Sequence, residues 1–420
     1  MEVALHRRAV AGCEVLQDAG KPVSIKAFNF AATPHIHFGA GERAKLKGIA
    51  GSFATADNKG ILLVTGGHSF DASALCTDLL EELSAGFDVH RIRVSGEPSP
   101  ELVDAAVAEF HVSNPCCVIA IGGGSAVDAG KAIAGLLPLG DSVMEYLEGV
   151  GKGRAYQGPS TPFIAVPTTA GTGGETSKNA VLSEIGEQGF KKSFRDEMLV
   201  ARHIVLDPEL TLSCPPDVTA ACGMDAFTQL LESYVSSRAN PMTDALALSG
   251  MRLVRDHLMM AVEQGDDIAA RSAMLYASAM SGLTLANAGL GSVHGLASPL
   301  GACFPIPHGV VCGTLLHEAT ALNIAAMQDR EPLNPGLVRY AEAGRLLVDN
   351  VTLPDDAALT ALVAALQSWS DCLKMQRLGE YGVTKDDIPR IVAGSRGNSM
   401  QTNPIVLTDD EIAGLVYSRL

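Results

Sequence analysis

The sequence predicts an α/β domain with a parallel sheet, followed by an all-helical domain. Over residues 28–207, short runs of aliphatic and β-branched residues alternate with segments of helical periodicity, which is typical of a parallel sheet covered on both faces. Over residues 208–420, one segment of helical spacing follows another. Ligands bind such sheets at the carboxyl ends of the strands, so we expect a site in the cleft between the two domains.

The elements of the first domain follow in order from residue 28. HIHFGAGERAKL at 35–46 predicts a short strand, a glycine turn and the start of a helix. A hairpin is predicted from 180–183 and 190–193, closed by EIGEQG. Strands are predicted at 61–65, 89–94, 118–121 and 163–166, with helices ending near 85, covering 100–112 and beginning directly after 125.

The second domain is predicted to contain helices only. Several of its segments begin at Asp, Ser, Thr or Asn, the residues that cap helix N-termini. The predicted helices lie near 217–236, 241–264, 266–288, 309–324, 335–347, 355–374, 386–394 and 409–419.

Composition excludes several classes of function. With 420 residues, 47% hydrophobic and 19% charged, the chain is long and apolar enough for two packed cores. A formal charge of −16 argues against nucleic acid or an anionic membrane as a partner. The nine cysteines form no CxxC or other zinc spacing, and residues 1–27 form an extension without a signal-peptide core or a bilayer-spanning run. We therefore expect reduced cysteines and a cytoplasmic protein.

A glycine-rich turn follows the predicted strand 117–121. Gly122, Gly123, Gly124 and Ser125 lead directly into a helix that carries Asp128. Glycines let the backbone approach a pyrophosphate closely, and a helix N-terminus offers unpaired N–H groups. The pattern differs from the GxGxxG dinucleotide fingerprint, and three glycines also form plain tight turns.

A second polar loop follows the predicted strand 163–166. Its hydroxyls and glycines suit phosphate and ribose contacts better than core packing, with an ordinary loop as the alternative. Lys191 is expected to project from the predicted hairpin, where simple solvation is the alternative. In the loop after strand 163–166, the candidate cofactor contacts are Thr168, Thr169, Thr172 and Asn179.

Four further residues have the chemistry of a cation site. Asp225 and Gln229 are four apart, which places both on one face of a helix. His294 and His308 lie within GLGSVHGLASPLGACFPIPHG, flanked by helix-like sequence. A carboxylate, an amide oxygen and two imidazoles can surround a divalent cation. The alternative is a helix-capping Asp with packed or surface histidines.

Four motifs in this order resemble the iron-containing (group III) alcohol dehydrogenases: GGGSAVDAGKA, PTTAGTGGETSKNAV, GMDAFTQLLESYVS and the His294/His308 segment. The resemblance runs from about residue 28 to the C-terminus. It implies an N-terminal nucleotide-binding domain, a C-terminal helical domain and a catalytic Fe2+ or Zn2+ in the cleft. Because relatives are commonly dimers or larger, it also implies a homo-oligomer, with strands at 28–38 pairing across a two-fold axis.

The resemblance also assigns residues. The Gly122–Ser125 turn matches the pyrophosphate site, and Asp225, His294 and His308 match three of the family's four metal ligands. Further positions around the cofactor match Asp128, Thr168, Thr169, Thr172, Asn179 and Lys191.

Two positions depart from the family pattern. Gln229 stands where the family has a ligand His, so Gln229 or a water is expected as the fourth ligand and metal affinity should fall. Ser298 stands where a further His lies near the substrate, which removes a proton-relay imidazole. Ser298 is expected to orient the substrate or to begin a proton path.

A third departure bears on the cofactor. An acidic residue at the end of the second strand, which bonds the ribose 2′-OH and repels a 2′-phosphate, is replaced by Gly66. Beside it, His68 and Ser69 can contact a phosphate. The sequence therefore predicts NADP(H) over NAD(H), and mixed use is compatible with it.

The predicted function is hydride transfer between NAD(P)(H) and a small alcohol or aldehyde, with the cation polarising the substrate oxygen. An apolar substrate is expected from Leu296, Pro299 and the FPI segment at 304–306. The first alternative is a metal-independent reductase of the maleylacetate reductase type, with His294 or His308 as general acid.

Two further alternatives remain open. One is a lyase related to dehydroquinate synthase, which needs several Arg and Lys in the cleft. Neither residue occurs between positions 286 and 323, so we expect a cleft poor in basic side chains. The other is a nucleotide-binding protein whose catalytic centre has decayed.

Overall fold

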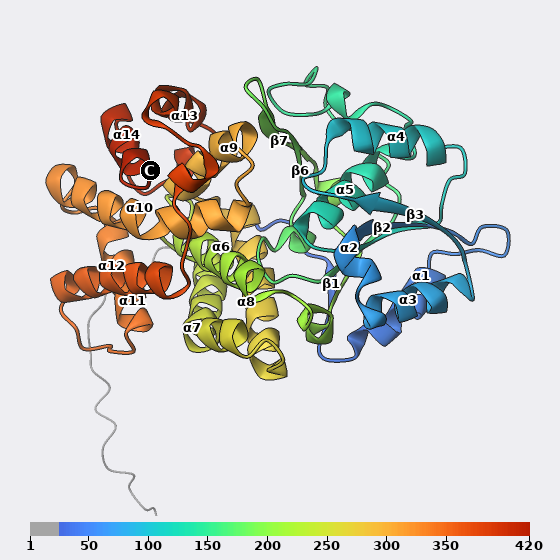
Figure 1. Ribbon diagram of the computed structural model, residues 1–420, viewed down its shortest axis with the longest axis horizontal. Coiled ribbons are helices and arrows are strands. Elements are labelled where there is room, and N and C mark those ends of the chain that lie inside the picture. The colour runs from blue at the N-terminus through green and yellow to red at the C-terminus, as the bar shows by residue number, and fades with distance from the viewer. Residues whose placement is uncertain (1–24) are drawn as a thin grey trace, which may run out of the picture.

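The computed structural model describes residues 25–420, so most of the expected extension 1–27 lies outside the described residues. An α/β domain forms one half of the molecule and a helical region the other (Figure 1). Both the parallel sheet and the helical region that the sequence predicts are confirmed.

The α/β domain is built on six parallel strands in the order β1-β8-β5-β4-β2-β3. β6 (Asn179–Glu184) and β7 (Phe190–Arg195) form the predicted hairpin. One sheet strand, β8, was not predicted, because its four residues are too few for a periodic pattern and depend on pairing with β1 and β5. The sheet strands are β1 (His35–Phe38), β2 (Gly60–Gly66), β3 (Asp88–Val94), β4 (Cys117–Gly122), β5 (Phe163–Pro167) and β8 (His203–Leu206).

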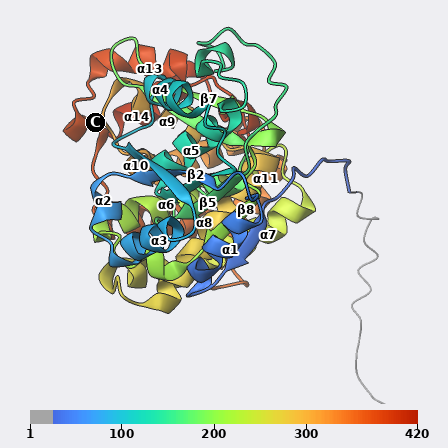
Figure 2. The same ribbon diagram turned by 90° about the vertical axis from the view of Figure 1, so that its right-hand side faces the viewer.

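Helices cover both faces of the sheet (Figure 2). Leu62 and Val64 of β2 pack in one core with α4 (Pro100–Phe110) and α5 (Gly124–Leu136). Ile61 and Leu63, on the opposite face, pack with α1 (Leu46–Gly51) and α3 (Ala74–Ser84). Since both faces are covered, the inner strands β2, β4 and β5 are almost entirely buried, and a ligand can reach the sheet only at its edges and strand ends.

The helix expected to end near 85 is divided in two. α2 (His68–Asp71) ends just before Ser73, whose hydroxyl accepts a hydrogen bond from the Cys76 N–H and caps α3. A serine at this position favours a new helix start, which the apolar spacing alone did not indicate.

The helical region contains one helix that was not predicted and one that is longer than predicted. α9 (Ser292–Cys303) includes Gly295, Pro299 and Gly301, which mask a helical pattern. α10 (His308–Arg330) extends beyond the predicted 309–324. The other helices of this region are α6 (Pro216–Val235), α7 (Pro241–Glu263), α8 (Ile268–Ala288), α11 (Pro335–Leu347), α12 (Asp355–Cys372), α13 (Ile388–Gly394) and α14 (Asp409–Tyr417).

Among the described residues, α10 alone is long and apolar enough by length and composition to cross a bilayer. Within the fold, 78% of its apolar window is buried against other parts of the protein. α10 packs on α6, α9 and α12, as a core helix does.

Candidate active site

A cleft of about 1150 Å³ lies between the strand ends of the α/β domain and the helical region. Twelve of the residues singled out in the sequence line it. They are Gly124, Ser125, Asp128, Thr169, Thr172, Asn179, Lys191, Asp225, Gln229, His294, Ser298 and His308. The remaining ones, which do not line it, are Gly66, His68, Ser69, Gly122, Gly123 and Thr168.

The glycine turn is fixed by close packing between strand ends. Gly122 ends β4, and Gly123 is the N-cap of α5. A Cβ on Gly122 would lie 2.8 Å from the Ala126 Cβ and 3.0 Å from the Gly66 nitrogen, so only glycine fits. The turn therefore opens the α5 N-terminus toward the cleft, as a phosphate site requires.

The polar loop after β5 packs directly on this turn. The Thr168 N–H donates to the Gly122 carbonyl at 2.9 Å. A Cβ on Gly123 would lie 3.4 Å from the Thr169 Oγ1, and one on Gly124 would lie 3.2 Å from the Thr172 Oγ1. The two loops thus form one surface, with hydroxyls set against the glycine backbone.

A buried lysine holds the polar loop from below. The Lys131 ammonium on α5 donates to the carbonyls of Gly174 at 2.5 Å and Asn179 at 2.7 Å. Burial lowers the pKa of Lys131, although Asp128 and Glu175 act to raise it. Sequence reasoning did not assign this role, because a lysine inside a helix is usually solvated.

Two carboxyl groups act on this lysine, Glu175, which is buried, and Asp128, which is half-buried at the cleft. Burial raises the pKa of Asp128 to about 6 and that of Glu175 to about 7, with Lys131 opposing both shifts. Within the described part of the chain, Glu175 Oε1 has no hydrogen-bond partner. Both groups therefore retain protons at a higher pH than solvated carboxylates do.

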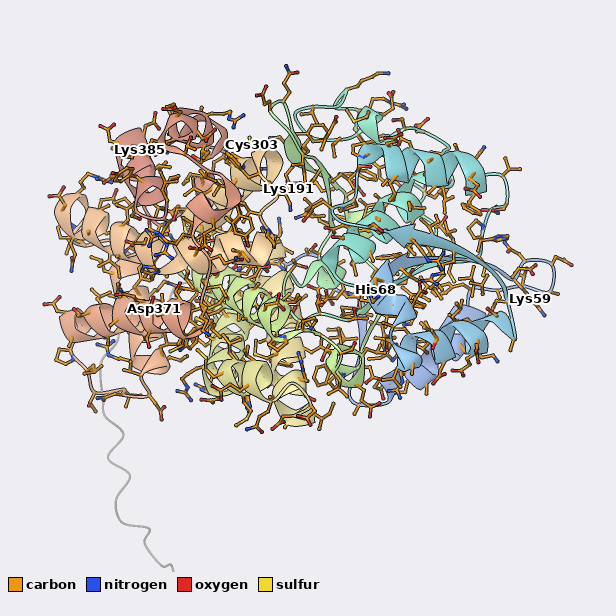
Figure 3. All side chains as sticks on the ribbon, in the orientation of Figure 1. Lys59, His68, Lys191, Cys303, Asp371 and Lys385 are labelled. Atoms are coloured by element: carbon orange, nitrogen blue, oxygen red, sulfur yellow. The ribbon has the colours of Figure 1, made fainter. Side chains whose placement is uncertain are left out.

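Lys191 and Ser298 connect the hairpin to the helical region. The Lys191 Nζ on β7 lies 3.0 Å from Glu97 Oε2, and Figure 3 places Lys191 where the two halves of the molecule meet. The Ser298 hydroxyl on α9 donates to the Lys191 carbonyl at 3.1 Å. Burial acts to raise the pKa of Glu97, but Lys191 lowers it overall.

The end of the second strand carries small residues and a nearby basic group. Gly66 ends β2, while His68 and Ser69 form the first turn of α2, where both are exposed (His68 is labelled in Figure 3). On the neighbouring strand β3, Arg93 pairs in register with Thr65, and its Nε lies 3.4 Å from Asp71 Oδ2. Sequence reasoning missed Arg93, because strand order cannot be derived from spacing.

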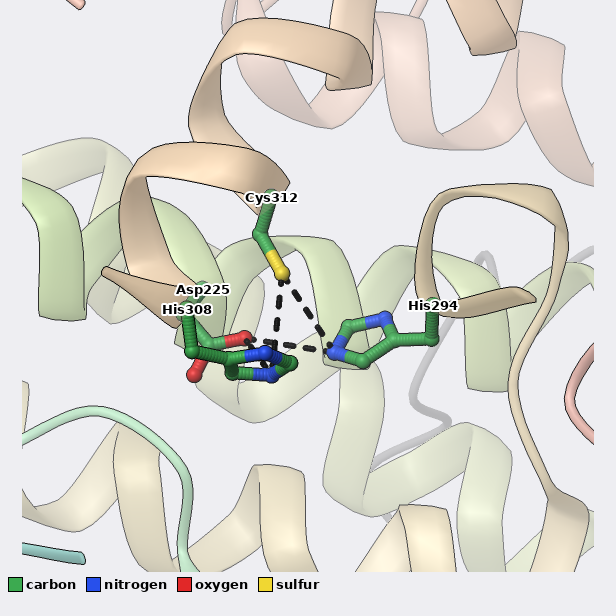
Figure 4. A group of neighbouring side chains, drawn as sticks. All are labelled: Asp225, His294, His308 and Cys312. Atoms are coloured by element: carbon green, nitrogen blue, oxygen red, sulfur yellow. Dashed lines mark hydrogen bonds and ion pairs between the residues drawn. The ribbon is translucent and has the colours of Figure 1, made fainter. Parts of the chain in front are cut away.

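At the other end of the cleft, four potential metal ligands converge: Asp225, His294, His308 and Cys312 (Figure 4). They come from α6, α9 and α10, and their donor atoms all lie within 4.8 Å of one another. Asp225 Oδ1 lies 3.2 Å from His294 Nε2 and 3.7 Å from His308 Nε2. A buried carboxylate, two imidazoles and a thiol at these separations suit a divalent transition metal.

Glu232 fixes the orientation of one imidazole. Its Oε2 lies 2.7 Å from His294 Nδ1, and its Oε1 accepts the Val293 N–H at 2.7 Å. With Nδ1 engaged, His294 presents Nε2 to Asp225, the arrangement that orients a metal-binding histidine. Sequence reasoning missed Glu232 and Cys312. Spacing could have found both, since Glu232 follows Asp225 by two helical turns and Cys312 follows His308 by one.

The groups of this cluster shift one another's pKa values. Burial acts to raise the pKa of Asp225, but His308 and His294 lower it to about 2. Burial lowers the pKa of His308 to about 4, against the effect of Asp225. Burial also acts to lower the pKa of His294, but Cys312, Asp225 and Glu232 raise it. Asp225 and His308 are thus in the ionised and neutral states that bind metal, whereas the shift of His294 favours its protonated form.

Gln229 lies at the margin of the cluster. Its Nε2 is 3.5 Å from Asp225 Oδ1, and its Oε1 is 3.0 Å from the Ser281 hydroxyl. The amide is buried, so both of its ends are set by these neighbours.

Two expectations about the cleft are wrong. Leu296, Pro299 and the 304–306 segment do not line it: Leu296 and Pro299 are buried on α9, and Ile306, which follows α9, is buried as well. Apolar lining comes instead from Val181, Val218, Leu285, Leu290, Val310, Leu373 and Met375. The cleft is also not poor in basic residues, since the hairpin and the connecting loops, which lie outside 286–323, supply them. The basic lining residues are Lys178, Lys191, Lys192, Arg195, Arg238 and Lys374.

The chain is similar to known proteins along nearly its whole length. Residues 33–208 match the family described as iron-containing alcohol dehydrogenase, and residues 219–420 match the C-terminal part of the Fe-containing alcohol dehydrogenase family. The NAD-dependent methanol dehydrogenase of Bacillus methanolicus is 32% identical over 387 residues, which cover 90% of this chain and 97% of that protein.

Solved structures give the same result. The crystal structure of a 1,3-propanediol oxidoreductase matches with a TM-score of 0.84 at 29% identity, covering 94% of this chain and 100% of that one. A sulfoacetaldehyde reductase from Bifidobacterium kashiwanohense, in complex with NAD+, matches with a TM-score of 0.79 at 28% identity, covering 94% of this chain and 99% of that one.

Proposed function

Since this chain belongs to the iron-containing alcohol dehydrogenase family, and is an NAD(P)-dependent alcohol dehydrogenase, we propose that its cleft interconverts a small alcohol and its aldehyde with the help of a divalent cation. One observation carries the proposal. The four-ligand cluster and the glycine turn line or border the same cavity of about 1150 Å³. A dinucleotide whose pyrophosphate is bound at the turn can therefore place its nicotinamide next to a substrate bound at the cluster.

The two halves of the chain divide the work in this proposal. Residues 28–207 bind the dinucleotide and residues 208–420 hold the cation, which is Fe2+ or Zn2+. Asp225, His294 and His308 are its proposed ligands. When bound, the cation supplies Lewis acidity that lowers the pKa of the alcohol. For the fourth ligand, the sequence predicts Gln229 or a water.

The chain's own residues bind and orient the cofactor. The backbone of Gly122–Ser125 receives the pyrophosphate at the α5 N-terminus. Lys191, held by Glu97, reaches the cleft from β7 and fixes the nicotinamide end. Further cofactor contacts are proposed for Asp128, Thr168, Thr169, Thr172 and Asn179.

Ser298 is the proposed substrate contact. Its hydroxyl hydrogen is directed to the Lys191 carbonyl, so its oxygen lone pairs can accept a hydrogen bond from an alcohol in the cleft. This orients the alcohol in the cleft. A small substrate with an apolar part fits beside Leu290 and Val310, which line the cleft.

We further propose that the enzyme prefers NADP(H). Gly66 offers no carboxylate to repel a 2′-phosphate, and His68 and Ser69 lie beside it. Arg93, one strand away, adds positive charge at the same edge. The relatives named NAD-dependent or bound to NAD+ make mixed use the main alternative.

The other readings are not favoured. The relatives and solved structures reported above are named as dehydrogenases, an oxidoreductase and a reductase, and the chain retains Asp225, His294 and His308 together. This weighs against a metal-free reductase that uses His294 or His308 as general acid, against a lyase, and against a decayed centre.

A homodimer in the cytoplasm is the proposed state. β1 is an edge strand of the sheet, and its Ile36 and Phe38 are exposed, which suits pairing with a second copy. The eight cysteines in the described part of the chain have free thiols, which fits a reducing compartment. Light scattering on the Ile36→Lys variant tests the dimer, which this substitution should dissociate.

The test of the function is metal content combined with turnover. Protein purified without oxygen or chelator should contain close to one Fe or Zn per chain and reduce a short aldehyde with NADPH faster than with NADH. Chelation should abolish turnover, and added metal should restore it. Turnover that survives complete metal removal would overturn the cation mechanism and favour His294 or His308 as proton donor.

A further inference from the structure

We propose that the Cys312 thiolate, rather than Gln229 or a water, is the fourth ligand of the cation, giving an Asp–His–His–Cys set. This inference rests on the proposed function, because it concerns the same cation. It differs from the ligand set of the resembling family, in which three histidines accompany the Asp.

Two distances within the cluster match a tetrahedral site, and the two that involve His308 are slightly longer. Metal bonds of roughly 2.0–2.3 Å place neighbouring N and O ligands about 3.3 Å apart, and N and S ligands about 3.6 Å apart. His294 Nε2 lies 3.2 Å from Asp225 Oδ1 and 3.6 Å from Cys312 Sγ. His308 Nε2 lies 3.7 Å from Asp225 Oδ1 and 3.8 Å from Cys312 Sγ. Four edges of the tetrahedron are therefore already present.

The position of Cys312 follows from the helix that carries it. Cys312 lies four residues after His308 on α10, so both side chains share one face of this helix. Its side chain is fully buried, and its sulfur contacts both imidazole Nε2 atoms. The sulfur thus occupies a corner of the cluster that Asp225 and the two histidines leave open.

The Gln229 amide is not oriented to act as the fourth ligand of the cation. Its amide has one end at Ser281, 3.0 Å away, and the other at Asp225 Oδ1, 3.5 Å away. The Ser281 hydroxyl donates to Gln229 Oε1, so the amide oxygen already has a partner outside the cluster. The carbonyl oxygen therefore points to Ser281 and away from the cluster. Gln229 acts as a positioning residue for Asp225.

The ligand chemistry has a consequence for the metal. On binding, the Cys312 thiol loses its proton to solvent, so Asp225 and Cys312 together balance the two charges of the cation. Thiolate is a soft ligand that favours Zn2+ over harder cations. The four-residue set is thus expected to take up zinc more readily than a set completed by an amide oxygen.

Cobalt substitution tests the ligand directly, without relying on activity. Apo-enzyme prepared by chelation is titrated with Co2+ under nitrogen while bound cobalt and the absorption spectrum are measured. Visible ligand-field bands report cobalt binding, and a near-ultraviolet charge-transfer band reports a thiolate ligand. Cys222→Ser is the matched control, because Cys222 also lines the cleft but is outside the four-residue cluster.

Wild type, Cys222→Ser and Gln229→Leu should all bind one cobalt and show the charge-transfer band. Cys312→Ser and Cys312→Ala should lose that band and bind cobalt at least about tenfold more weakly. X-ray absorption of the zinc form should give a sulfur neighbour at roughly 2.3 Å in wild type, and no such neighbour in Cys312→Ser or Cys312→Ala.

Two results would overturn the proposal, and they are distinguishable. Stoichiometric cobalt with no charge-transfer band in wild type, and weak binding in Gln229→Leu, would assign the fourth position to Gln229 and leave the proposed function intact. An apo-enzyme that binds no cobalt, and a purified enzyme that is active without metal, would overturn the cation site itself.

Discussion

The two ends of the cleft are built by different means. At the proposed phosphate end, the backbone and glycines of one strand-to-helix turn form the surface, with threonines from the neighbouring loop packed against them. At the cation end, four side chains from α6, α9 and α10 converge, and Glu232 orients one of them. The first end depends on the absence of side chains, and the second on their exact identity.

This difference determines how each end should respond to substitution. Adding any side chain at the turn should impair nucleotide binding and leave the metal in place. Changing a ligand should remove the metal and leave nucleotide binding in place. Variants at the two ends therefore separate the two functions of the cleft.

Asp225→Asn should give the largest effect. The neutral amide removes the charge that holds the cation, and Lewis-acid stabilisation of several kcal/mol corresponds to a loss of about 10³-fold in kcat. Metal content measured by elemental analysis should fall with it. NADPH affinity, followed by fluorescence, should stay within about twofold of wild type. A variant that keeps both its metal and its turnover would contradict the assignment of Asp225.

Gly122→Ala should impair the opposite end. Its Cβ would lie 2.8 Å from the Ala126 Cβ and 3.0 Å from the Gly66 nitrogen, so the turn must shift. Losing one or two charge-assisted contacts to the pyrophosphate should weaken NADPH binding by about 10- to 100-fold. Metal content should be unchanged. Gly48→Ala is the control, because a Cβ there meets nothing within 4 Å.

Gly66→Asp should change the cofactor preference at the proposed nucleotide end. A carboxylate at the end of β2 repels a 2′-phosphate and accepts a hydrogen bond from a 2′-OH. The ratio of kcat/KM for NADPH to that for NADH should fall by about tenfold or more, which corresponds to roughly 1.4 kcal/mol. Gly66→Ala adds bulk without charge and should leave the ratio nearly unchanged. An unchanged ratio in Gly66→Asp would place the 2′-position elsewhere.

The same difference explains what could be predicted from sequence. The phosphate end is formed by contiguous residues, so the Gly122–Ser125 turn could be recognised from its pattern and its flanking strand and helix. Asp225, His294 and His308 come from separate segments; their chemistry suggested a shared cation site, and the family resemblance added the assignment of each as a ligand. Cys312 and Glu232 were missed, although each shares a helix face with a recognised ligand.

Other misses have a common physical cause. β8 is specified by its neighbours in the sheet, and α9 by packing that overrides its glycines and its proline. The lining of the cleft depends on how α9 is rotated, which spacing alone does not fix. Features set by tertiary contacts were therefore the ones that the sequence did not predict.

The pKa values of buried carboxyl groups shift in opposite directions at the two ends of the cleft. Asp225 is held ionised by His308 and His294, with its pKa lowered to about 2. Glu175 is buried behind the polar loop, and burial raises its pKa to about 7. The folded state therefore binds the Glu175 proton more tightly than the unfolded state does. Stability from this group is present below pH about 4.5, and it declines as the pH rises to about 7.

Glu175→Gln should remove this decline. The variant should have no stability advantage at pH 4.5, and should be more stable than wild type at pH 8 by on the order of 1–2 kcal/mol. Chemical denaturation at the two pH values measures the difference. Asp128, whose pKa burial raises to about 6, keeps a smaller decline of the same sign in the variant. An advantage equal at both pH values would mean that packing, rather than ionisation of Glu175, separates the two proteins.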